Sequence, residues 1–288
     1  MIPNGPNRVG VLWTGNRIPF CIDTTLDINT RQTIEDALVS AWGLWVAEGV
    51  RGLVFEPGSQ EECQAGESNT YLSVTISETS MATTLGMGGA GGRMMLVMDE
   101  NFGLGDRVAN FAHEIGHAWG LVHEHQRPDV WTADYGGTAT SNTFTFNCQN
   151  LKDYQSTLST NGYTPGSQPA IQMCLTLSAA GTAHFGGGLN YLPYEQGSVV
   201  TTSKFDEKSI MLYASNTGGI VDAGNRRDVY TFANGGQVGP NRVPSQVDVE
   251  NLQTLYGIQT SSVGQCLAYM PCSPFQSLFS SLTGCIKP

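Results

Sequence analysis

Positive charge is scarce in this chain. Its 288 residues contain 14 Lys and Arg against 25 Asp and Glu, and the formal net charge is −11. Proteins that bind nucleic acid usually present a basic face, and the few basic residues here are scattered along the sequence. No apolar run approaches the roughly 18–20 residues that cross a bilayer. The composition therefore argues against a nucleic-acid partner and against a membrane span.

Several short motifs are also missing. None of the seven cysteines forms a CxxC pair, which argues against a thiolate zinc knuckle and a thioredoxin-like redox site. The opening residues, MIPNGPNRVG, lack the apolar core of a signal peptide, so the chain is expected to begin near a mature terminus. Low charge and dispersed cysteines still favour an oxidising, extracellular compartment. The odd number leaves at least one cysteine without a partner inside the chain.

The apolar pattern predicts an α+β fold. Runs of alternating or continuous apolar residues predict strands at 9–22 (two strands around a Thr-Gly-Asn turn), 53–56, 71–76 and 94–98. Apolar stripes with helical spacing predict three helices, at 29–47, 106–119 and 245–256.

Capping residues set the ends of two of these helices. Asn29 is the expected cap of the first helix, and Ser245 with Asp248 forms a capping box for the last. The stretch 132–205 is rich in Gly, Ser, Thr and Asn and has weak periodicity. We therefore expect a loop-rich segment there, tied by Cys148 and Cys174.

Histidine is rare, and four of the five histidines lie in HEIGHAWGLVHEH, residues 113–125. His113 and His117 are four residues apart, so they share one face of a helix. A catalytic zinc takes three protein ligands and keeps one position for water. Gly120 lets the chain turn back so that His123 can approach as the third ligand. In an extended chain His123 and His125 point the same way, so spacing alone does not choose between them.

Glu114 lies between the first two histidines, beside a bound metal. From there a carboxylate can take a proton from the activated water and deliver it to the leaving amine. A lone HExxH arises by chance, and helical histidines are usually surface or core residues. Here five positions agree in H-E-x-x-H-x-x-G-x-x-H, the metzincin signature, in a chain poor in histidine. The pattern therefore favours a metal site.

The stretch HEIGHAWGLVHEHQRPD resembles the astacin metallopeptidases, whose pattern continues as H-E-x-x-R-x-D after the third histidine. His123, Glu124, Arg127 and Asp129 match that continuation. The resemblance implies that His123 is the third zinc ligand and that His125 occupies a variable position.

A second match lies downstream, where SIMLY at residues 209–213 resembles the astacin Met-turn. On its own this string would predict a buried strand or turn. The resemblance implies that Met211 forms an apolar floor under the zinc. It also implies that Tyr213 is an additional zinc ligand, able to swing away and stabilise the oxyanion. Leu212 stands where the family usually has histidine, at a position that is not a ligand.

Glu124 has two interpretations. By the resemblance it contacts the new amino terminus after a propeptide is removed, which would place the mature start near Pro3–Asn4. Without the resemblance it would be a surface carboxylate or a partner of Arg127.

The resemblance implies a metzincin-like, two-lobed catalytic domain over residues 1–257. Its amino-terminal lobe, about 1–120, would hold a twisted mixed sheet and two long helices. Its irregular carboxy-terminal lobe, about 121–257, would hold a late helix, with the active-site cleft between the lobes. Residues 258–288 would form a cysteine-containing extension. The usual disulfides of the family have no clear equivalents.

The predicted function is that of a secreted, zinc-dependent endopeptidase with one catalytic Zn²⁺. Its substrate would be an extended polypeptide aligned along an edge strand at 94–98 by main-chain hydrogen bonds, with binding residues Met94, Met95, Leu96 and Val97. The alternative is a zinc-binding adhesion or recognition protein with little hydrolytic activity. No oligomeric state is predicted.

Two other features are assigned no ligand, and the first is expected to be a mobile loop that leads into the strand at 94–98. GMGGAG at residues 86–91 fits G-x-G-x-x-G, but a dinucleotide site needs its strand before the glycines, and here the apolar run follows them. His184 is isolated in a polar segment and is assigned no role.

Overall fold

A computed structural model of the protein describes residues 2–3, 11–64, 70–88, 91–131, 144–195, 199–200 and 205–258, with the backbone alone for 2–3 and 199–200. Met1–Ile258 forms one compact unit. Among the residues described, no helix has both the length and the apolar character needed to cross a membrane. The predicted extension lies outside the described residues from residue 259 onward.

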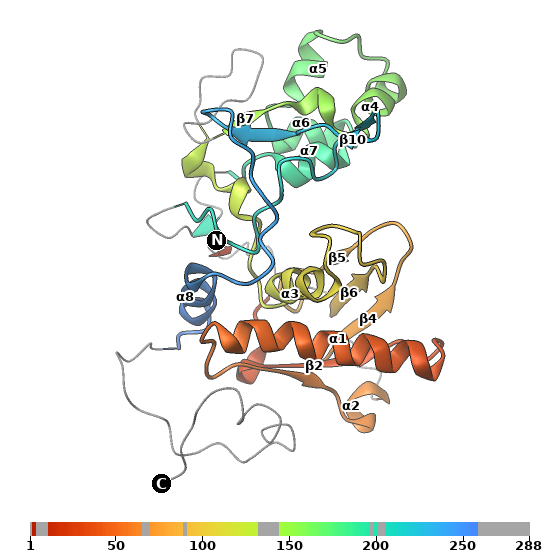
Figure 1. The fold of residues 1–288 in the computed structure, drawn as a ribbon, viewed down its shortest axis with the longest axis vertical. Coiled ribbons are helices and arrows are strands. Elements are labelled where there is room, and N and C mark those ends of the chain that lie inside the picture. Colours follow the sequence, from red (N-terminus) through yellow and green to blue (C-terminus); the bar gives the residue numbers. More distant parts are fainter. Residues whose placement is uncertain are drawn as a thin grey trace. The chain divides into compact units, whose positions relative to one another are not determined.

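A five-stranded mixed sheet occupies the first part of the chain, in the order β3-β2-β4-β6-β5 (Figure 1). Its strands are β2 Arg17–Ile22, β3 Val54–Pro57, β4 Leu72–Ile76, β5 Ala82–Thr83 and β6 Gly92–Leu96. Neighbours among β2, β3, β4 and β6 pair in parallel, and β5 pairs antiparallel with β6. Apolar side chains of the parallel strands are buried in the core, as expected for strands covered by helices.

The predicted edge position of residues 94–98 is wrong. Ala82 pairs with Met95 and Thr83 pairs with Met94, so β5 covers that side of β6 and forms the edge itself. Met94, Leu96 and Val97 are buried. A strand of two residues has no apolar alternation to reveal it, which is why the sequence pattern does not predict β5.

The opening segment also differs from the prediction, because its described residues before the turn, 11–13, form no strand. Val11 O accepts a hydrogen bond from the Met87 amide at 2.6 Å, so this part of the backbone bonds to a loop and not to β2. A single 3₁₀ turn, Thr14–Asn16, precedes β2. Residues 9 and 10 lie outside the described residues.

Two long helices lie side by side against the sheet (Figure 1). They are α1, Ile28–Ala47, and α3, Arg107–Ala118. Asp27, and not Asn29, caps α1: its backbone is extended and its carboxylate accepts hydrogen bonds from the next turn. Asp106 caps α3 in the same way. A short helix, α2, follows at Gln60–Gln64, and a Cys21–Cys63 disulfide links it to β2.

Beyond residue 144 the elements are short. The helices are α4 Tyr154–Asn161, α5 Gln168–Gln172, α6 Leu177–Thr182, α7 Gly186–Tyr191 and α8 Gln246–Leu255. The strands pair antiparallel as β7 Phe144–Phe146 with β11 Tyr230–Phe232, β9 Val221–Asp222 with β10 Asn225–Arg226, and β1 Ile2–Pro3 with β8 Val199–Val200. A single 3₁₀ turn lies at Cys148–Asn150, and two others precede this part of the chain, at Glu124–Gln126 and Pro128–Val130.

The segment predicted to be loop-rich therefore contains four short helices, α4 to α7. Their glycines and hydroxyl residues hide the helical period, because each helix is too short to show a full apolar stripe. The Cys148–Cys174 disulfide is present as predicted, and so is the capping box of α8 formed by Ser245 and Asp248. A second apolar core, rich in aromatic rings, surrounds that disulfide. The whole arrangement is the predicted α+β fold.

Candidate active site

Helix α3 carries the first three residues of the motif. The Asp106 carboxylate accepts from the Ala109 amide at 2.8 Å and fixes the start of the helix. From residue 109 to residue 118 every residue of α3 is buried, so its histidines are held inside the protein. The His113 and His117 rings meet edge to face, with centroids 4.8 Å apart.

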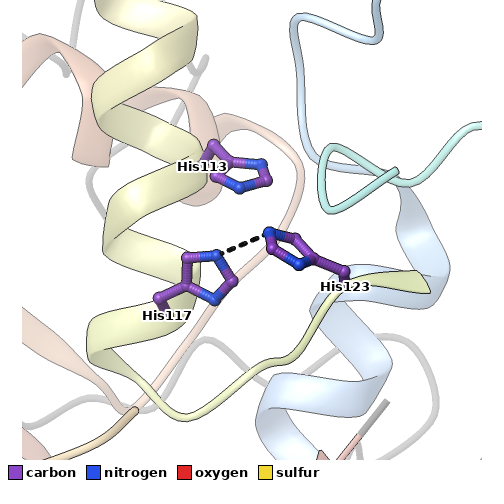
Figure 2. A group of neighbouring side chains, drawn as sticks. All are labelled: His113, His117 and His123. Atoms are coloured by element: carbon purple, nitrogen blue, oxygen red, sulfur yellow. Dashed lines mark hydrogen bonds between the residues drawn. The ribbon is translucent and has the colours of Figure 1, made fainter. Parts of the chain in front are cut away.

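The chain turns back after α3. Gly120 has φ +103°, a conformation that favours glycine, and the Leu121 amide donates to Gly116 O at 2.9 Å. His123 follows in extended backbone, and its ring lies 4.7 Å from that of His117. Figure 2 shows the result: two imidazoles from α3 face a third from the returning segment.

The three histidines form a group that could hold a metal ion, with ligand atoms all within 4.8 Å of one another. His117 Nε2 and His123 Nε2 are 3.1 Å apart (Figure 2). His125 is not part of this group, although in an extended chain it would point the same way as His123. Its Nε2 donates to Asn190 O at 2.8 Å, and its ring stacks behind the His123 ring.

Each histidine of the group uses its other ring nitrogen to donate to a protein oxygen. His113 Nδ1 lies 2.8 Å from Ile210 O, His117 Nδ1 lies 2.8 Å from Leu121 O, and His123 Nδ1 lies 3.0 Å from Gln126 Oε1. Since these oxygens only accept, each Nδ1 must carry the proton. The three Nε2 lone pairs are therefore free to bind a metal, the arrangement that orients histidine ligands in metalloproteins.

The residues fit a zinc ion. Burial lowers the pKa of His113 to about 4 and that of His117 to about 3, and it lowers the pKa of His123 well below its usual value. All three rings are thus neutral near pH 7, as metal binding requires. Two neutral acceptor nitrogens 3.1 Å apart repel unless a cation or a proton lies between them. A buried set of three imidazoles is a donor set that zinc prefers.

Glu114 follows His113 on α3 and is 5% exposed. Its Oε2 is buried and has no hydrogen-bond partner among the described residues. Burial raises the pKa of Glu114 to about 7, and the nearby Thr83 hydroxyl opposes that shift. A bound cation would favour the ionised form. Glu114 therefore presents a carboxyl oxygen with no partner among the described residues, next in sequence to a histidine of the group.

Met211 lies directly against α3. A Cβ added to Gly116 would come within 2.6 Å of Met211 Sδ, so the helix accepts Met211 only because residue 116 has no side chain. The Glu124 amide donates to Met211 O at 3.0 Å. The turn at 209–213 is thus packed between the motif helix and the segment that carries the third histidine.

Tyr213 lies next to the histidine group. Its ring centroid is 4.2 Å from that of His123 and 5.9 Å from that of His113. Tyr230 donates its hydroxyl to the Tyr213 carbonyl and fixes the backbone there. Burial, together with the charge of Glu114, raises the pKa of Tyr213, so its phenol stays protonated at neutral pH.

Glu124 is buried, which excludes the surface interpretation. Arg127 Nη1 donates to Glu124 Oε1 at 2.9 Å, and both side chains are almost fully enclosed. Arg127 also binds Asp129 through two hydrogen bonds. The other interpretation, in which Glu124 is the partner of Arg127, is therefore confirmed. The predicted contact with an amino terminus lies outside the described residues, apart from the backbone of Pro3.

Two supporting residues are not evident from the sequence. Gln126 supplies the acceptor for His123 Nδ1, and its own amide is oriented by donation to Leu189 O and Leu192 O at 2.9 Å. Asp248 accepts from the turn at 209–210. Its capping box is visible in the sequence, but its contact with a segment 38 residues away is not.

Comparison with known proteins supports this interpretation of the site. The profile of the astacin peptidase family matches residues 6–157. No curated protein sequence matches the chain. The solved structure of high choriolytic enzyme 1, a hatching enzyme zinc-protease from Oryzias latipes (medaka), superimposes with a TM-score of 0.50 and 19% identity, over 86% of this chain and 95% of that one.

A structure of myroilysin aligns with a TM-score of 0.46 and 16% identity, over 85% of this chain and 95% of that one. The hatching enzyme shows that the fold is shared, and the profile covers more than half of the sequence, including the motif that carries the three histidines. The chain therefore belongs to the astacin family of peptidases and is a zinc metalloendopeptidase.

Proposed function

We propose that His113, His117 and His123 bind one catalytic Zn²⁺. The observation that carries this proposal is the convergence of three buried imidazoles whose Nδ1 atoms are all engaged elsewhere. Catalytic zinc sites use three protein ligands and leave a further position open. A bound zinc ion polarises a substrate carbonyl and makes a water molecule easier to deprotonate.

Glu114 is the proposed general base and, later, the general acid. Its buried Oε2 has no partner among the described residues, so it can accept the proton of the attacking water. Because Glu114 is next to a ligand on the same rigid helix, that oxygen is held beside the reacting atoms. It can then deliver the proton to the amine that leaves the peptide.

Tyr213 is proposed as an additional ligand that can move away and donate its hydroxyl to the oxyanion. Its ring contacts the His123 ring, which places the side chain beside the metal group. A phenol that keeps its proton at neutral pH is a suitable donor to developing negative charge. Met211 supports the site by packing against α3 at Gly116, and Glu124 supports it through the hydrogen bond from its backbone amide to Met211 O.

The substrate of this family is a polypeptide. We propose that it binds extended and pairs with the outer edge of β5 at Ala82–Thr83, in place of the predicted pairing with residues 94–97. Among the described strands β5 is the one at that edge of the sheet. Strand β5 packs against α3, the helix that carries Glu114, so this edge passes close to the base. An unpaired strand edge offers the main-chain groups that an extended peptide needs.

We also propose that residues 1–257 form the catalytic domain, with lobes at about 1–120 and 121–257, and that 258–288 is an extension. The protein is proposed to act outside the cell. The support is the pair of disulfides, Cys21–Cys63 and Cys148–Cys174, since such bonds persist in oxidising compartments.

The decisive experiment compares the wild-type protein with the Glu114→Gln variant. Both should bind one zinc ion per chain, measured by metal analysis after dialysis. The variant should lose about 10²–10⁴-fold in cleavage of casein and of a quenched peptide. Glu100→Gln serves as the control, because the Glu100 side chain is 72% exposed on a loop; it should retain full activity.

Two results would contradict the proposal. Normal proteolysis by Glu114→Gln would remove Glu114 from the mechanism. Absence of cleavage by zinc-loaded wild-type protein would instead support a zinc-binding recognition protein.

The variant Tyr213→Phe keeps the ring and removes the donor, so it should lose about 10²–10³-fold in kcat while still folding.

A further inference from the structure

The carboxylate of Asp248 binds two parts of the chain at once. Within α8, its Oδ2 accepts from the Ser245 amide at 2.9 Å, which belongs to the capping box. Across the fold, its Oδ1 accepts from the Ser209 hydroxyl at 2.6 Å and its Oδ2 accepts from the Ile210 amide at 2.8 Å. The Ser209 hydroxyl in turn accepts from the Met211 amide at 3.0 Å. One buried carboxylate therefore organises the whole start of the 209–213 turn.

The residue that Asp248 holds is the one that orients a proposed zinc ligand. The Ile210 amide donates a hydrogen bond to Asp248, and Ile210 O accepts a hydrogen bond from His113 Nδ1 at 2.8 Å. The two hydrogen bonds lie on the two sides of the same residue. Fixing Ile210 therefore fixes the acceptor that determines the tautomer and the ring orientation of His113.

The other two histidines use acceptors that lie close to them in the chain, although Gln126 is itself oriented by the carbonyls of Leu189 and Leu192. His117 uses Leu121 O, four residues along the chain, and that segment is held by the bond from the Leu121 amide to Gly116 O. His123 uses Gln126, three residues along the chain. His113 is separated from its acceptor by 97 residues. Its orientation thus depends on how firmly the distant turn is held.

Helix α8 is a firm base for that turn. Val249 and Leu252 are buried in the same apolar core as Ile115 of α3 and Met211. Tyr256, which follows α8, donates its hydroxyl to Trp119 O at 3.1 Å. The helix that carries Asp248 therefore shares an apolar core with the helix that carries His113, and the residues that follow the two helices are hydrogen-bonded to each other.

We propose that Asp248 is a positioning residue for the zinc centre: by holding Ser209 and Ile210 it fixes His113 in its metal-binding orientation. This inference rests on the proposed binding of zinc by His113. A role in capping α8 alone does not account for the geometry. The carboxylates that cap α1 and α3, Asp27 and Asp106, are exposed, whereas Asp248 is 2% exposed and makes two bonds outside its own helix.

Burial of this kind is unfavourable for a carboxylate unless hydrogen bonds compensate it. Burial raises the pKa of Asp248 to about 6, against the opposing effect of the hydrogen bonds from Ser209, Ser245 and Ile210. All three of these residues donate hydrogen bonds to the carboxyl oxygens of Asp248. The hydrogen bonds that Asp248 accepts thus offset part of the cost of burying its carboxylate.

The test measures Zn²⁺ affinity by competition with a chromophoric chelator, using the full chain. Asp248→Ala should bind Zn²⁺ about tenfold more weakly, the lower end of what losing a ligand's supporting partner causes. Asp248→Asn can still present an oxygen to the Ile210 amide, so it should recover most of the affinity. Ser245→Ala is the matched control: it weakens the helix cap, lowers the melting temperature of the zinc-free protein, and should leave Zn²⁺ affinity within twofold.

The outcomes distinguish failure of the proposed function from failure of this inference. Wild-type protein that binds no Zn²⁺ would overturn both. Wild-type protein that binds Zn²⁺ while Asp248→Ala binds it equally well would overturn this inference alone, as would an equal loss in Ser245→Ala. If Asp248→Ala does not fold, Ser209→Ala decides: a twofold to fivefold loss of affinity supports the role of Asp248, and unchanged affinity overturns it.

Discussion

Residues 11–131 and residues 144–258 are built in different ways. The first region has a five-stranded sheet covered by helices of 20 and 12 residues, so its apolar core is spread over long, regular elements. In the second region the longest described helix has 10 residues, and the described strands have two or three. Its core gathers around a disulfide and a group of aromatic rings.

The difference shows how the site is assembled. The first region carries His113, Glu114 and His117 on the rigid helix α3 and His123 on the segment that turns back after it, so the spacing of residues fixes their geometry. The second region contributes Ile210, Met211 and Tyr213 through individual contacts with the motif. A core that is spread over long elements tolerates a single substitution better than a site that depends on a few individual contacts. We therefore expect the largest loss at the junction, and we expect changes in the second region to disturb the local structure more than comparable changes in the sheet.

The largest loss is expected from Arg127→Met, at the junction between the two regions. Removing the guanidinium leaves the Glu124 charge buried, and breaking a buried pair in this way costs about 3–5 kcal/mol. Urea unfolding with a linear extrapolation measures the change. The control is Arg227→Met, whose pair with Asp222 is about half exposed and should contribute less than about 1 kcal/mol. Equal losses from the two variants would show that burial of the Arg127 pair has no special importance.

Removal of the second region's disulfide should follow in size. The variant Cys148→Ser with Cys174→Ser releases a loop closed over 26 residues, for which loop entropy gives about 3.5 kcal/mol. Limited proteolysis should then cut between the two positions, because α4 and α5 are short and depend on that link. The corresponding double change at Cys21 and Cys63, 42 residues apart, is the comparison. Loop entropy makes its loss slightly larger, yet the sheet should remain resistant to protease. If protease instead cut the sheet region after removal of Cys21–Cys63, and left the second region intact after removal of Cys148–Cys174, the sheet region would be the one that depends on its disulfide.

The two regions also differ in how far local sequence predicts them. Helices over 29–47 and 106–119 are evident, since stripes such as Ile34, Leu38 and Ala41 recur at helical spacing and are buried in the structure. The cap at Asp27 is not evident, because Asn29 offers an equally good local pattern. The strand β5 is not evident either, because two residues carry no period. Most of the sheet region thus follows from local sequence.

The second region follows from sequence only at isolated points. The capping box of α8 is predictable from a short motif, the Cys148–Cys174 bond from the two cysteines of the loop-rich segment, and the SIMLY turn from the family resemblance. Four helices within 154–191 are not, because each is shorter than the window in which helical periodicity becomes visible. Contacts that join distant segments, such as Asp248 with Ile210, depend on the folded chain and leave no local trace. The histidine group is predictable because its three members lie within eleven residues on a helix and its return turn.

Inside the sheet region, Gly116→Ala tests whether packing or helix propensity dominates. Alanine favours a helix by about 1 kcal/mol relative to glycine, but its Cβ would lie 2.6 Å from Met211 Sδ and 3.2 Å from Trp45. Overpacking of this kind costs about 1–3 kcal/mol, so the variant should lose stability and bind zinc more weakly. Gly181→Ala in α6 is the matched control: its nearest neighbour would be Leu189 Cδ2 at 3.9 Å, and it should be neutral or stabilising. Stabilisation by both changes would mean that Met211 can move away from α3 at little cost.

The smallest effect is expected at an ion pair on the surface of the sheet region. Arg17 Nη1 lies 2.6 Å from Glu62 Oε1, with the two side chains 36% and 31% exposed. The hydrogen bond from Arg17 lowers the pKa of Glu62 from 4.5 to about 2. Because the pKa is lower in the folded state, the stabilisation is complete above about pH 5 and declines as the pH falls toward 2. Solvent screening limits its size to about 0.5 kcal/mol.

Glu62→Gln should therefore be less stable than the wild-type protein by about 0.5 kcal/mol at pH 7, and the difference should shrink steadily between pH 5 and pH 2. Thermal unfolding of both proteins across this range isolates the Glu62 contribution, since the other carboxyl groups titrate alike in each. Glu61→Gln on the same helix is the control, because Glu61 makes no ion pair with any described residue. A difference between wild type and Glu62→Gln that stays constant with pH would show that the lost interaction is packing and not charge. In that case the sheet region, too, would owe part of its stability to a single specific contact.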